Sequence, residues 1–466
     1  MKQTLGVIIG NRNFFPDVLI SEARADVSAL FDELNINAVM LDAETKLGAV
    51  ETWDDAKKCA ALFDANRHLI DGILILLPNF GEEKGIADAV KLSGLAAPIL
   101  IQAYPDDMNR LTVDRRRDSF CGKISLCNNL RQYNLPFTLT KLHTVHPQSE
   151  SFKEDLQTFL GVCRVVKGLR QARFGAIGAR PNAFQTVRYS EKILQDAGVS
   201  VQTIDFSEVF GNANKLADDD ARVKGRMAQI SAYADAAGVP PKSMLLMAKL
   251  ALVIDDWMQE LDLHATALQC WTSLQQNYGV NACTIMSMLS QNMRPSACEV
   301  DITGVMSMYA LQLASGTPSA LVDWNNNYAD DPDKCVFFHC GNWAKDFLPD
   351  IQIRTAEILG TIVGEENTYG ALAGRTPSGP LSFARITTDD AYGEIRAYIG
   401  EGEFTDDPLQ TFGARAVVRV ENLQSLLKYI CKNGFEHHAA MSMSRVADIL
   451  EEAFANYLEW DVYRHV

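Results

Sequence analysis

The sequence predicts an α/β protein with two parallel-sheet α/β domains, followed by a mostly antiparallel, barrel-like β domain with a terminal helix. Three observations support this fold class. Short apolar runs alternate with longer helical patterns in the first third of the chain, and this alternation restarts near residue 170. After about residue 345, runs with every second residue apolar appear instead. A chain of 466 residues is also too long for one hydrophobic core.

The first predicted domain covers residues 1–170. Its predicted strands are Thr4–Ile9, Ala38–Leu41, Gly72–Leu77 and Pro98–Gln102, and its predicted helices include Asp17–Leu34 and Asp54–Ile70. Strands this apolar are typical of a parallel sheet covered on both faces. Ligands of such sheets bind at the loops after the strands, so Arg12, Asn13 and Asn79 are candidate substrate contacts. The same residues also fit ordinary turn capping.

The second predicted domain covers residues 171–345, and the third covers residues 346–466. The second domain has predicted strands at Phe174–Ile177 and Val201–Phe206 and predicted helices at Phe184–Ala197, Ser243–Leu263 and Leu268–Asn277. The third has predicted strands at Ser382–Ile386, Glu394–Ile399 and Ala414–Val420, and the helix Ala447–Leu458 closes the chain.

Composition narrows the classes of partner. The net charge of −16 makes nucleic acid and anionic membranes poor partners. No apolar run approaches the roughly 20 residues of a membrane span, and the first residues do not resemble a signal peptide. The ten cysteines are scattered and form no Cys-x-x-Cys pair, which is typical of reduced thiols in a core. We therefore expect a cytoplasmic protein.

The stretch from Cys298 to Trp343 carries the most chemical information. Glu299 precedes a helical run, Asp323 closes an apolar strand, and His339 ends a second apolar strand. Two carboxylates and an imidazole suit Mn²⁺, Mg²⁺, Co²⁺ or Zn²⁺, and the oxygen-rich set favours Mn²⁺ or Mg²⁺. For each residue alone, a cap or a packed side chain is the favoured interpretation, but together the three residues favour a metal site.

A second stretch, Asn433-Gly-Phe-Glu-His-His-Ala-Ala-Met-Ser, places two adjacent histidines before the terminal helix. Adjacent side chains do not easily bind one ion, so at most one of His437 and His438 is expected to be a ligand. The other histidine is a candidate substrate contact. Trp343 is a further candidate contact, because an aromatic face can pack against a bound ligand, although core packing is the favoured explanation.

These segments resemble the L-fucose isomerase and L-arabinose isomerase superfamily. Glu299, Asp323 and the Glu-His-His segment stand in the order of that family's metal-binding positions. Asp118-Ser-Phe-Cys-Gly-Lys and Gly178-Ala-Arg-Pro also resemble family segments, so the resemblance runs through nearly the whole chain. One branch of the superfamily acts on sulfoquinovose, a sulfonated hexose, and Arg12 or the cluster Arg115–Arg117 can meet a sulfonate.

The resemblance implies a metal-dependent aldose–ketose isomerase that is a homo-oligomer, a hexamer or a trimer, with sites near subunit interfaces. It implies that Glu299 and Asp323 are metal ligands and the acid/base pair. The sequence leaves open which of the two is the base, and Glu299 is our first choice. The resemblance also implies that His437 contacts the sugar and His438 binds the metal. His339 resembles the extra histidine ligand of the arabinose branch, so its role is that of a ligand or a substrate contact.

Such an enzyme moves a proton between C1 and C2 of the sugar through a cis-enediolate. A divalent ion stabilises the enediolate, and a carboxylate acts as the base that takes and returns the proton. Two other classes remain open. A sugar-binding or sensor protein needs neither a metal nor paired carboxylates, so metal-dependent activity separates it from the isomerase. A metal-dependent hydrolase or lyase would not exchange deuterium into C2 of an aldose.

Overall fold

The computed structural model describes residues 2–466 and divides them into two compact units. The first unit comprises residues up to Lys167 together with Glu452–Glu459, and the second comprises Gly168–Glu451 and Trp460–Val466. None of the helices formed by residues 2–466 is both long enough and apolar enough to cross a membrane.

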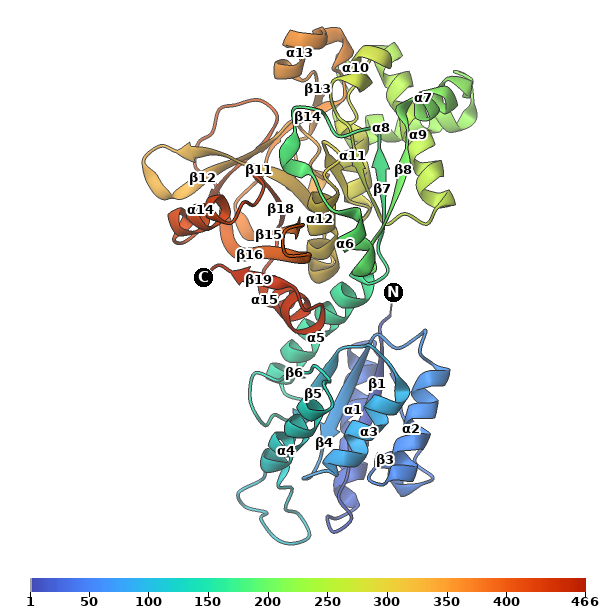
Figure 1. Ribbon diagram of the computed structural model, residues 1–466, viewed down its shortest axis with the longest axis vertical. Coiled ribbons are helices and arrows are strands. Elements are labelled where there is room, and N and C mark those ends of the chain that lie inside the picture. The colour runs from blue at the N-terminus through green and yellow to red at the C-terminus, as the bar shows by residue number, and fades with distance from the viewer. Residues whose placement is uncertain (1) are drawn as a thin grey trace. The chain divides into compact units, whose positions relative to one another are not determined.

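The first unit contains a six-stranded, fully parallel sheet with helices on both faces (Figure 1). The strand order is β2-β1-β4-β5-β6, and β3 also pairs with β1. The strands are β1 (Thr4–Gly10), β2 (Asn37–Val39), β3 (Ala49–Val50), β4 (Gly72–Leu77), β5 (Ile99–Ala103) and β6 (Thr138–Leu139). The helices are α1 (Val18–Glu33), α2 (Trp53–Ala65), α3 (Glu83–Ser93), α4 (Ser119–Gln132) and α5 (Glu150–Leu169).

Two apolar clusters, one on each side of this sheet, explain why its strands are so uniformly apolar. One cluster packs α1 and α5 against one face, and the other packs α2, α3 and α4 against the opposite face. Every residue of β1 and β4 is buried. Near the C-terminus, Tyr457 joins this unit because its hydroxyl hydrogen-bonds to both backbone groups of Ile99.

The second unit begins with a four-stranded parallel sheet in the order β10-β9-β7-β8. Its strands are β7 (Arg173–Ile177), β8 (Ser200–Ile204), β9 (Ala265–Leu268) and β10 (Ser296–Cys298). The helices of this part are α6 (Glu191–Asp196), α7 (Phe206–Lys215), α8 (Ala221–Tyr233), α9 (Pro241–Glu260), α10 (Ser273–Asn277), α11 (Cys283–Gln291) and α12 (Ile302–Ser315).

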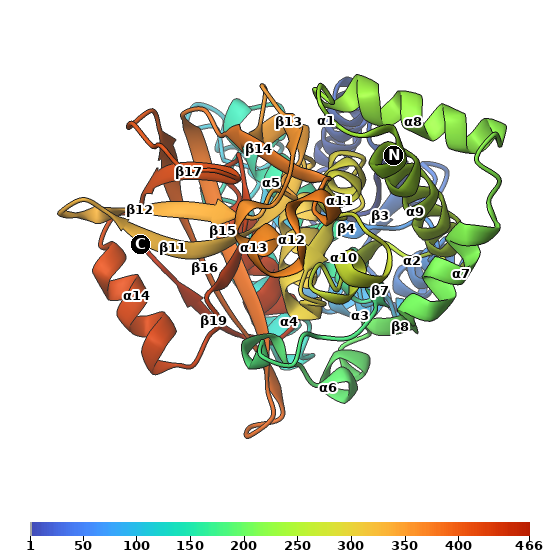
Figure 2. The same cartoon turned by 90° about the horizontal axis from the view of Figure 1, so that it is seen from above.

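A nine-stranded, mostly antiparallel sheet completes the second unit. Its order is β13-β14-β17-β12-β11-β18-β15-β16-β19, and an additional pairing of β16 with β17 closes six of these strands into a ring (Figure 2). The strands are β11 (Ser319–Tyr328), β12 (Asp331–His339), β13 (Gln352–Arg354), β14 (Ala371–Arg375), β15 (Gly379–Asp389), β16 (Glu394–Thr405), β17 (Ala414–Arg419), β18 (His438–Ser442) and β19 (Asp461–Arg464). The helices are α13 (Glu357–Val363), α14 (Leu423–Lys432) and α15 (Ala447–Glu451), which continues as a π-helix, Glu452–Tyr457.

The predicted fold class is confirmed, because two parallel sheets are followed by a mostly antiparallel, barrel-like sheet and a terminal helix. The predicted boundary near residue 345 falls inside one sheet, since β11 and β12 pair with β18 and β17. One apolar core also joins side chains from Ile177 to Met441. The division into three domains stays a prediction.

Two helix predictions were too long. Residues 184–197 form only a 3₁₀ turn, Gln185–Val187, and the short α6. The Arg180 guanidinium donates hydrogen bonds to the carbonyls of Pro181 and Phe184 and so fixes the preceding loop in a non-helical conformation. Residues 268–277 contain the end of β9 and the short α10. The irregular backbone between these two elements presents Cys270 and Trp271 to a buried carboxylate, as described below.

Candidate metal centre

The four side chains predicted as metal ligands lie together in the second unit. Glu299 follows β10, Asp323 lies in β11, His339 ends β12 and His438 begins β18. The antiparallel register places Asp323 directly opposite His438 in the β11–β18 pair. Residues opposite each other in such a pair have adjacent side chains, so the ring of strands itself brings these two groups together.

The donor atoms form two overlapping groups. Glu299, His339 and His438 make one group and Asp323, His437 and His438 make the other, with the atoms of each group within 4.8 Å of one another. Nε2 of His438 lies 3.3 Å from Oδ1 of Asp323 and 3.8 Å from Oε2 of Glu299, and Nε2 of His339 also lies 3.8 Å from Oε2 of Glu299. Ligand atoms bound at about 2.1 Å to one tetrahedral or octahedral ion stand about 3.0–3.5 Å apart. Because Glu299 and Asp323 share no group, one ion bound by both carboxylates requires one of these side chains to move inward.

Two carboxylate oxygens in this cluster are buried and unsatisfied. Among residues 2–466, no hydrogen-bond donor reaches Oε2 of Glu299 or Oδ1 of Asp323. Burying an acceptor without a partner is costly, and native structures rarely leave one in that state. Both oxygens approach the same ring nitrogen of His438, so a cation bound beside this nitrogen would satisfy the carboxylate oxygen nearest to it, and a shift of the other carboxylate would satisfy both. The residues present therefore fit a divalent metal.

Glu299 is fixed on one side only. Its Oε1 accepts hydrogen bonds from the Cys270 thiol at 3.2 Å and from the Trp271 indole N–H at 3.0 Å, which leaves Oε2 free. The backbone of Glu299 and Val300 adopts φ values of 55° and 57°, which non-glycine residues rarely adopt and which commonly mark functional sites. Burial raises the pKa of Glu299, while His438, Cys270 and Trp271 oppose the shift.

His438 is oriented by a buried ion network. Its Nδ1 lies 2.8 Å from Oδ2 of Asp301. The fully buried Arg385 donates to Oδ2 of Asp301 at 2.6 Å and to Oδ1 at 3.1 Å. Arg385 also pairs with Glu436 at 2.9 Å. Because Asp301 accepts the Nδ1 hydrogen, Nε2 presents a lone pair to the site, an arrangement typical of metal-binding histidines. Burial alone would raise the pKa of Asp301, but Arg385 and His438 hold it well below its usual range.

The charge state of His438 depends on the carboxylates around it. Burial lowers its pKa, but Asp301, Glu299 and Asp323 more than reverse this effect and raise the pKa above the ordinary value. Burial raises the pKa of Asp323 to about 6, with Glu299 adding to the shift and His438 opposing it.

His339 is held differently from His438. Its Nδ1 accepts a hydrogen bond from the backbone N–H of Cys340 at 3.0 Å. Burial, together with His438 and His437, lowers the pKa of His339 to about 3, so the ring is neutral. A neutral ring that accepts at Nδ1 carries its hydrogen on Nε2. This geometry favours a donor role over the predicted ligand role, and the choice between the two stays a prediction.

His437 lies at the edge of the cluster, with a side chain that is 45% exposed. Its Nε2 is 3.6 Å from Oδ1 of Asp323, and burial together with His438 lowers its pKa to about 4. The ring of Phe184 lies 5.3 Å from the ring of His437 and 5.4 Å from that of His438. His437 is thus neutral at the rim of the cluster, and its contact with the substrate stays a prediction.

The other predicted substrate contacts are placed less favourably. Trp343 is fully buried in the core, and its indole N–H donates to the carbonyl of Leu321, so its placement is that of a core residue. Asn79 is buried in the first unit and donates to Oδ1 of Asn11. Arg12 pairs with Glu82 and Glu83, and Asn13 is exposed. The substrate role of Arg12, Asn13 and Asn79 stays a prediction.

Sequence reasoning missed the residues that support the ligands. They are Asp301, Arg385 and Glu436 behind His438, Cys270 and Trp271 behind Glu299, and Phe184 beside the histidines. One signal was available, because Arg385 is the one charged residue in the otherwise uncharged run at 381–386. An arginine at such a position needs buried carboxylates as partners, and Asp301 and Glu436 are the acidic residues beside the predicted ligands.

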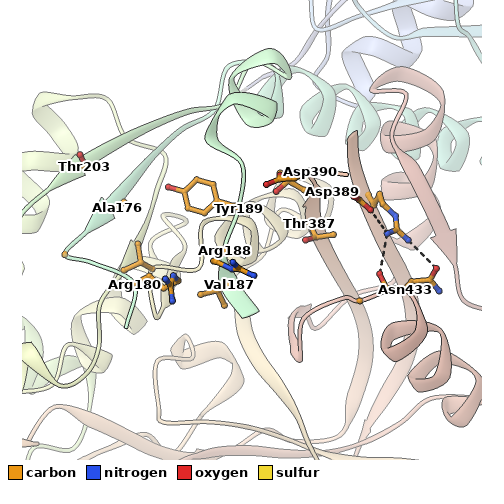
Figure 3. A pocket seen from close by; sticks show the side chains of 15 residues that line it. Ala176, Arg180, Val187, Arg188, Tyr189, Thr203, Thr387, Asp389, Asp390 and Asn433 are labelled. Atoms are coloured by element: carbon orange, nitrogen blue, oxygen red, sulfur yellow. Dashed lines mark hydrogen bonds and ion pairs between the residues drawn. The ribbon is translucent and has the colours of Figure 1, made fainter. Parts of the chain in front are cut away.

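A pocket of about 690 Å³ lies beside this centre (Figure 3). Val300 and Thr387 line it, and Thr387 donates to Glu436 of the buried network. Its charged lining mixes Arg180, Arg188 and Arg396 with Asp389 and Asp390. Arg396 is already paired with Asp389 at 3.0 Å. None of the four predicted ligands lines the pocket, so we do not assign it to the substrate.

Comparison of the sequence with known protein families identifies the class to which this chain belongs. Residues 6–170 match the family described as "Fucose/sulfoquinovose isomerase, N-terminal domain", and residues 337–465 match "L-fucose isomerase, C-terminal domain". The chain therefore belongs to the fucose/sulfoquinovose isomerase family, as the resemblance predicted. His339 and His438 lie inside the second match, whereas Glu299 and Asp323 lie between the two matches, so the geometry above carries their assignment.

Curated relatives cover most of the chain. The sulfoquinovose isomerase of Priestia aryabhattai is 25% identical over 342 residues, which is 72% of this chain and 74% of that protein. Those of Clostridium sp. (strain MSTE9) and Alkalicoccus urumqiensis are 24% and 23% identical, over 68% and 82% of this chain and 70% and 83% of their own lengths. Family and relatives together support an aldose–ketose isomerase.

Proposed function

We propose that this protein is a metal-dependent isomerase that interconverts an aldose and a ketose by proton transfer between C1 and C2. The observation that carries the proposal is the convergence of two unsatisfied carboxylate oxygens on Nε2 of His438, which Asp301 orients from behind. A site that only binds sugar has no need for two buried carboxylates facing one imidazole.

Glu299, Asp323 and His438 would hold the ion through Oε2, Oδ1 and Nε2, and Mn²⁺ is the first choice for this oxygen-rich set, with Mg²⁺, Co²⁺ and Zn²⁺ as alternatives. A bound divalent ion supplies positive charge at the sugar oxygens of C1 and C2 and so lowers the cost of removing the neighbouring proton. His339 faces the same space as a neutral N–H donor that can hold a sugar oxygen.

The two carboxylates differ in their freedom to move a proton. Oε1 of Glu299 accepts hydrogen bonds from Cys270 and Trp271, so only Oε2 is free to bind the ion. No oxygen of Glu299 then remains to take the proton. The side chain of Asp323 is 23% exposed, and its raised pKa suits an exchange of protons near neutral pH. This geometry favours Asp323 as the base, with Glu299 as the more rigid ligand, which reverses the first choice made from the sequence.

The substrate we propose first is sulfoquinovose, because all of the curated relatives above are sulfoquinovose isomerases. L-fucose and arabinose follow, because the C-terminal family is described as L-fucose isomerase. A sulfonate has three acceptor oxygens and a fixed negative charge, which arginine recognises well. In the first unit, Arg115 and Arg117 both pair with Glu22, so a sulfonate there would have to compete with a carboxylate.

A panel assay tests the proposal. Protein stripped of metal by chelation is incubated with each sugar, with and without Mn²⁺, and ketose formation is followed. We expect turnover of at least one sugar only with metal. Equal turnover before and after chelation would contradict the metal dependence. No turnover of any sugar in the panel by metal-loaded protein would contradict the isomerase function.

Metal affinity should depend on pH, because both Asp323 and His438 must lose a proton to bind an ion. The pKa of Asp323 is raised to about 6, so below that pH the carboxyl is protonated and the affinity for Mn²⁺ falls about tenfold per pH unit from this group alone. The raised pKa of His438 adds a further loss in the same direction. Calorimetric titration of Mn²⁺ between about pH 5 and 8 measures the effect. An affinity that is flat over this range would contradict the ligand assignment.

We also propose that the protein is a homo-oligomer. In the second unit, α13 has no buried residue and exposes Ile358 and Ile362 at 61% and 70%, beside an apolar pocket of about 730 Å³. Apolar surface of this kind commonly marks an interface. We expect the double variant Ile358→Glu, Ile362→Glu to reduce the particle mass measured by light scattering. Tyr392, which is 79% exposed, provides the control, and Tyr392→Glu should leave the particle mass unchanged. A monomeric wild-type protein would contradict this prediction.

A further inference from the structure

A pair of cysteines lies directly behind the proposed metal centre. Cys270 and Cys298 are both buried, and their sulfur atoms lie within 4.8 Å of each other. The proposed reaction uses neither thiol group for proton transfer. Cys270 lies in the irregular segment after β9, and Cys298 ends β10, so the parallel pairing of these two strands brings the thiols together.

Glu299 stands between two sets of ligands with different chemistry. Its Oε2 faces the imidazoles of His438 and His339, whereas its Oε1 faces the thiols. The sulfur atoms of Cys270 and Cys298 and a carboxylate oxygen of Glu299 all lie within 4.8 Å of one another. Two thiolates and a carboxylate attract thiophilic ions, whereas the opposite side of the same carboxylate offers only nitrogen and oxygen.

The spacing also fits an ion. Around a tetrahedral Zn²⁺, with bonds of about 2.3 Å to sulfur and 2.0 Å to oxygen, a sulfur and an oxygen stand about 3.5 Å apart. Sγ of Cys270 is 3.2 Å from Oε1 of Glu299. The thiol hydrogen of Cys270 occupies the position that an ion would take, and the Trp271 indole N–H can keep its own bond to the other lone pair of the same oxygen.

We propose that Cys270, Cys298 and Glu299 form a second, inhibitory metal site that selects thiophilic divalent ions such as Zn²⁺ and Cd²⁺. Binding replaces the two thiol protons, which pass to solvent, by two metal–sulfur bonds and one metal–oxygen bond to Oε1. The exchange of two protons for one divalent ion leaves the charge of the thiol site unchanged. The new metal–oxygen bond to Oε1 withdraws electron density from the carboxylate, so occupation of the thiol site weakens Mn²⁺ at Oε2. This inhibitory consequence depends on the proposed isomerase function, whereas the binding itself does not.

Cadmium binding tests the site without any assay of turnover. Metal-free protein is titrated with Cd²⁺, and the ultraviolet thiolate-to-cadmium charge-transfer band is recorded for the wild type, Cys298→Ser and Cys270→Ser. Cys431→Ser, which changes an exposed cysteine on α14, is the matched control. We expect a saturable band in the wild type and in Cys431→Ser, and a Cd²⁺ affinity at least about 10-fold lower in each of the other two variants.

Turnover measured separately with Mn²⁺ distinguishes the two proposals. Zn²⁺ is expected to inhibit the Mn²⁺-loaded wild type at least about 10-fold more strongly than Cys298→Ser. A wild type without the band, or an undiminished band in Cys298→Ser and Cys270→Ser, would overturn the thiol site and leave the isomerase intact. A normal band in a protein that isomerises no sugar would overturn the isomerase and leave the thiol site intact.

Discussion

Asp323→Asn and Glu299→Gln are each expected to lower kcat/KM for the sugar substrate by at least about 10³-fold while the fold survives. Each change removes a negative charge that the proposed ion needs and, for Asp323, the group that moves the proton. The amide is nearly the same size as the carboxyl, so the packing around β11 and β10 is preserved. Steady-state kinetics with Mn²⁺, together with circular dichroism and thermal unfolding, measure the two effects separately.

Asp390→Asn is the matched control for this pair of variants. Asp390 is an exposed aspartate that lines the pocket of Figure 3 and lies outside the cluster of four ligands. Its replacement should leave kcat/KM close to the wild-type value. Turnover near the wild-type rate in Asp323→Asn, or a large loss in Asp390→Asn, would place the chemistry elsewhere and contradict the site described above.

Arg385→Met is expected to lower the free energy of unfolding by about 3–5 kcal/mol, because it leaves two buried carboxylates without their cation. Arg385 is fully buried and pairs with Asp301 at 2.6 Å and with Glu436 at 2.9 Å. Methionine fills much of the same volume, so the loss reflects charge rather than an empty cavity. Urea denaturation monitored by fluorescence gives the difference through the midpoint at an unchanged slope.

A second arginine of the same sheet provides the comparison for Arg385. Arg396 in β16 pairs with Asp389 at 3.0 Å and with Asp461 at 3.2 Å, but the side chain of Asp461 is 55% exposed. Because solvent screens such a pair, Arg396→Met should cost about 1 kcal/mol or less. Equal losses in the two variants would show that burial of the network around His438 does not determine its strength.

Much of the fold was predictable because its signals are local. The uniformly apolar runs at Thr4–Gly10 and Gly72–Leu77 require cover on both faces, and the structure supplies it. Alternation in Glu394–Ile399 likewise indicated an antiparallel strand, although β16 extends to Thr405. The assignment of β11 and β12 to the closed sheet depends on pairing with strands about 80–120 residues away, and no local pattern encodes such a partner.

The residues that gather at the candidate site were predictable, whereas the residues that support them were not, and the ligand roles stay predictions. Glu299, Asp323 and His438 carry chemistry that stands out in the sequence, and the fold brings them together. Asp301 reads as an ordinary helix cap, and it does cap α12 by accepting from Gly304, while its second oxygen also orients His438. Such double roles arise from tertiary packing, so residue type and spacing alone do not reveal them.

Isomerisation in D₂O tests the central claim most directly. Metal-free protein is loaded with Mn²⁺, incubated with sulfoquinovose in D₂O, and the recovered aldose is analysed by nuclear magnetic resonance. Proton transfer between C1 and C2 by a side chain that exchanges with solvent predicts deuterium at C2 of the aldose, dependent on Mn²⁺ and absent in Asp323→Asn. Ketose formation that is equally fast without metal and in Asp323→Asn would contradict the account.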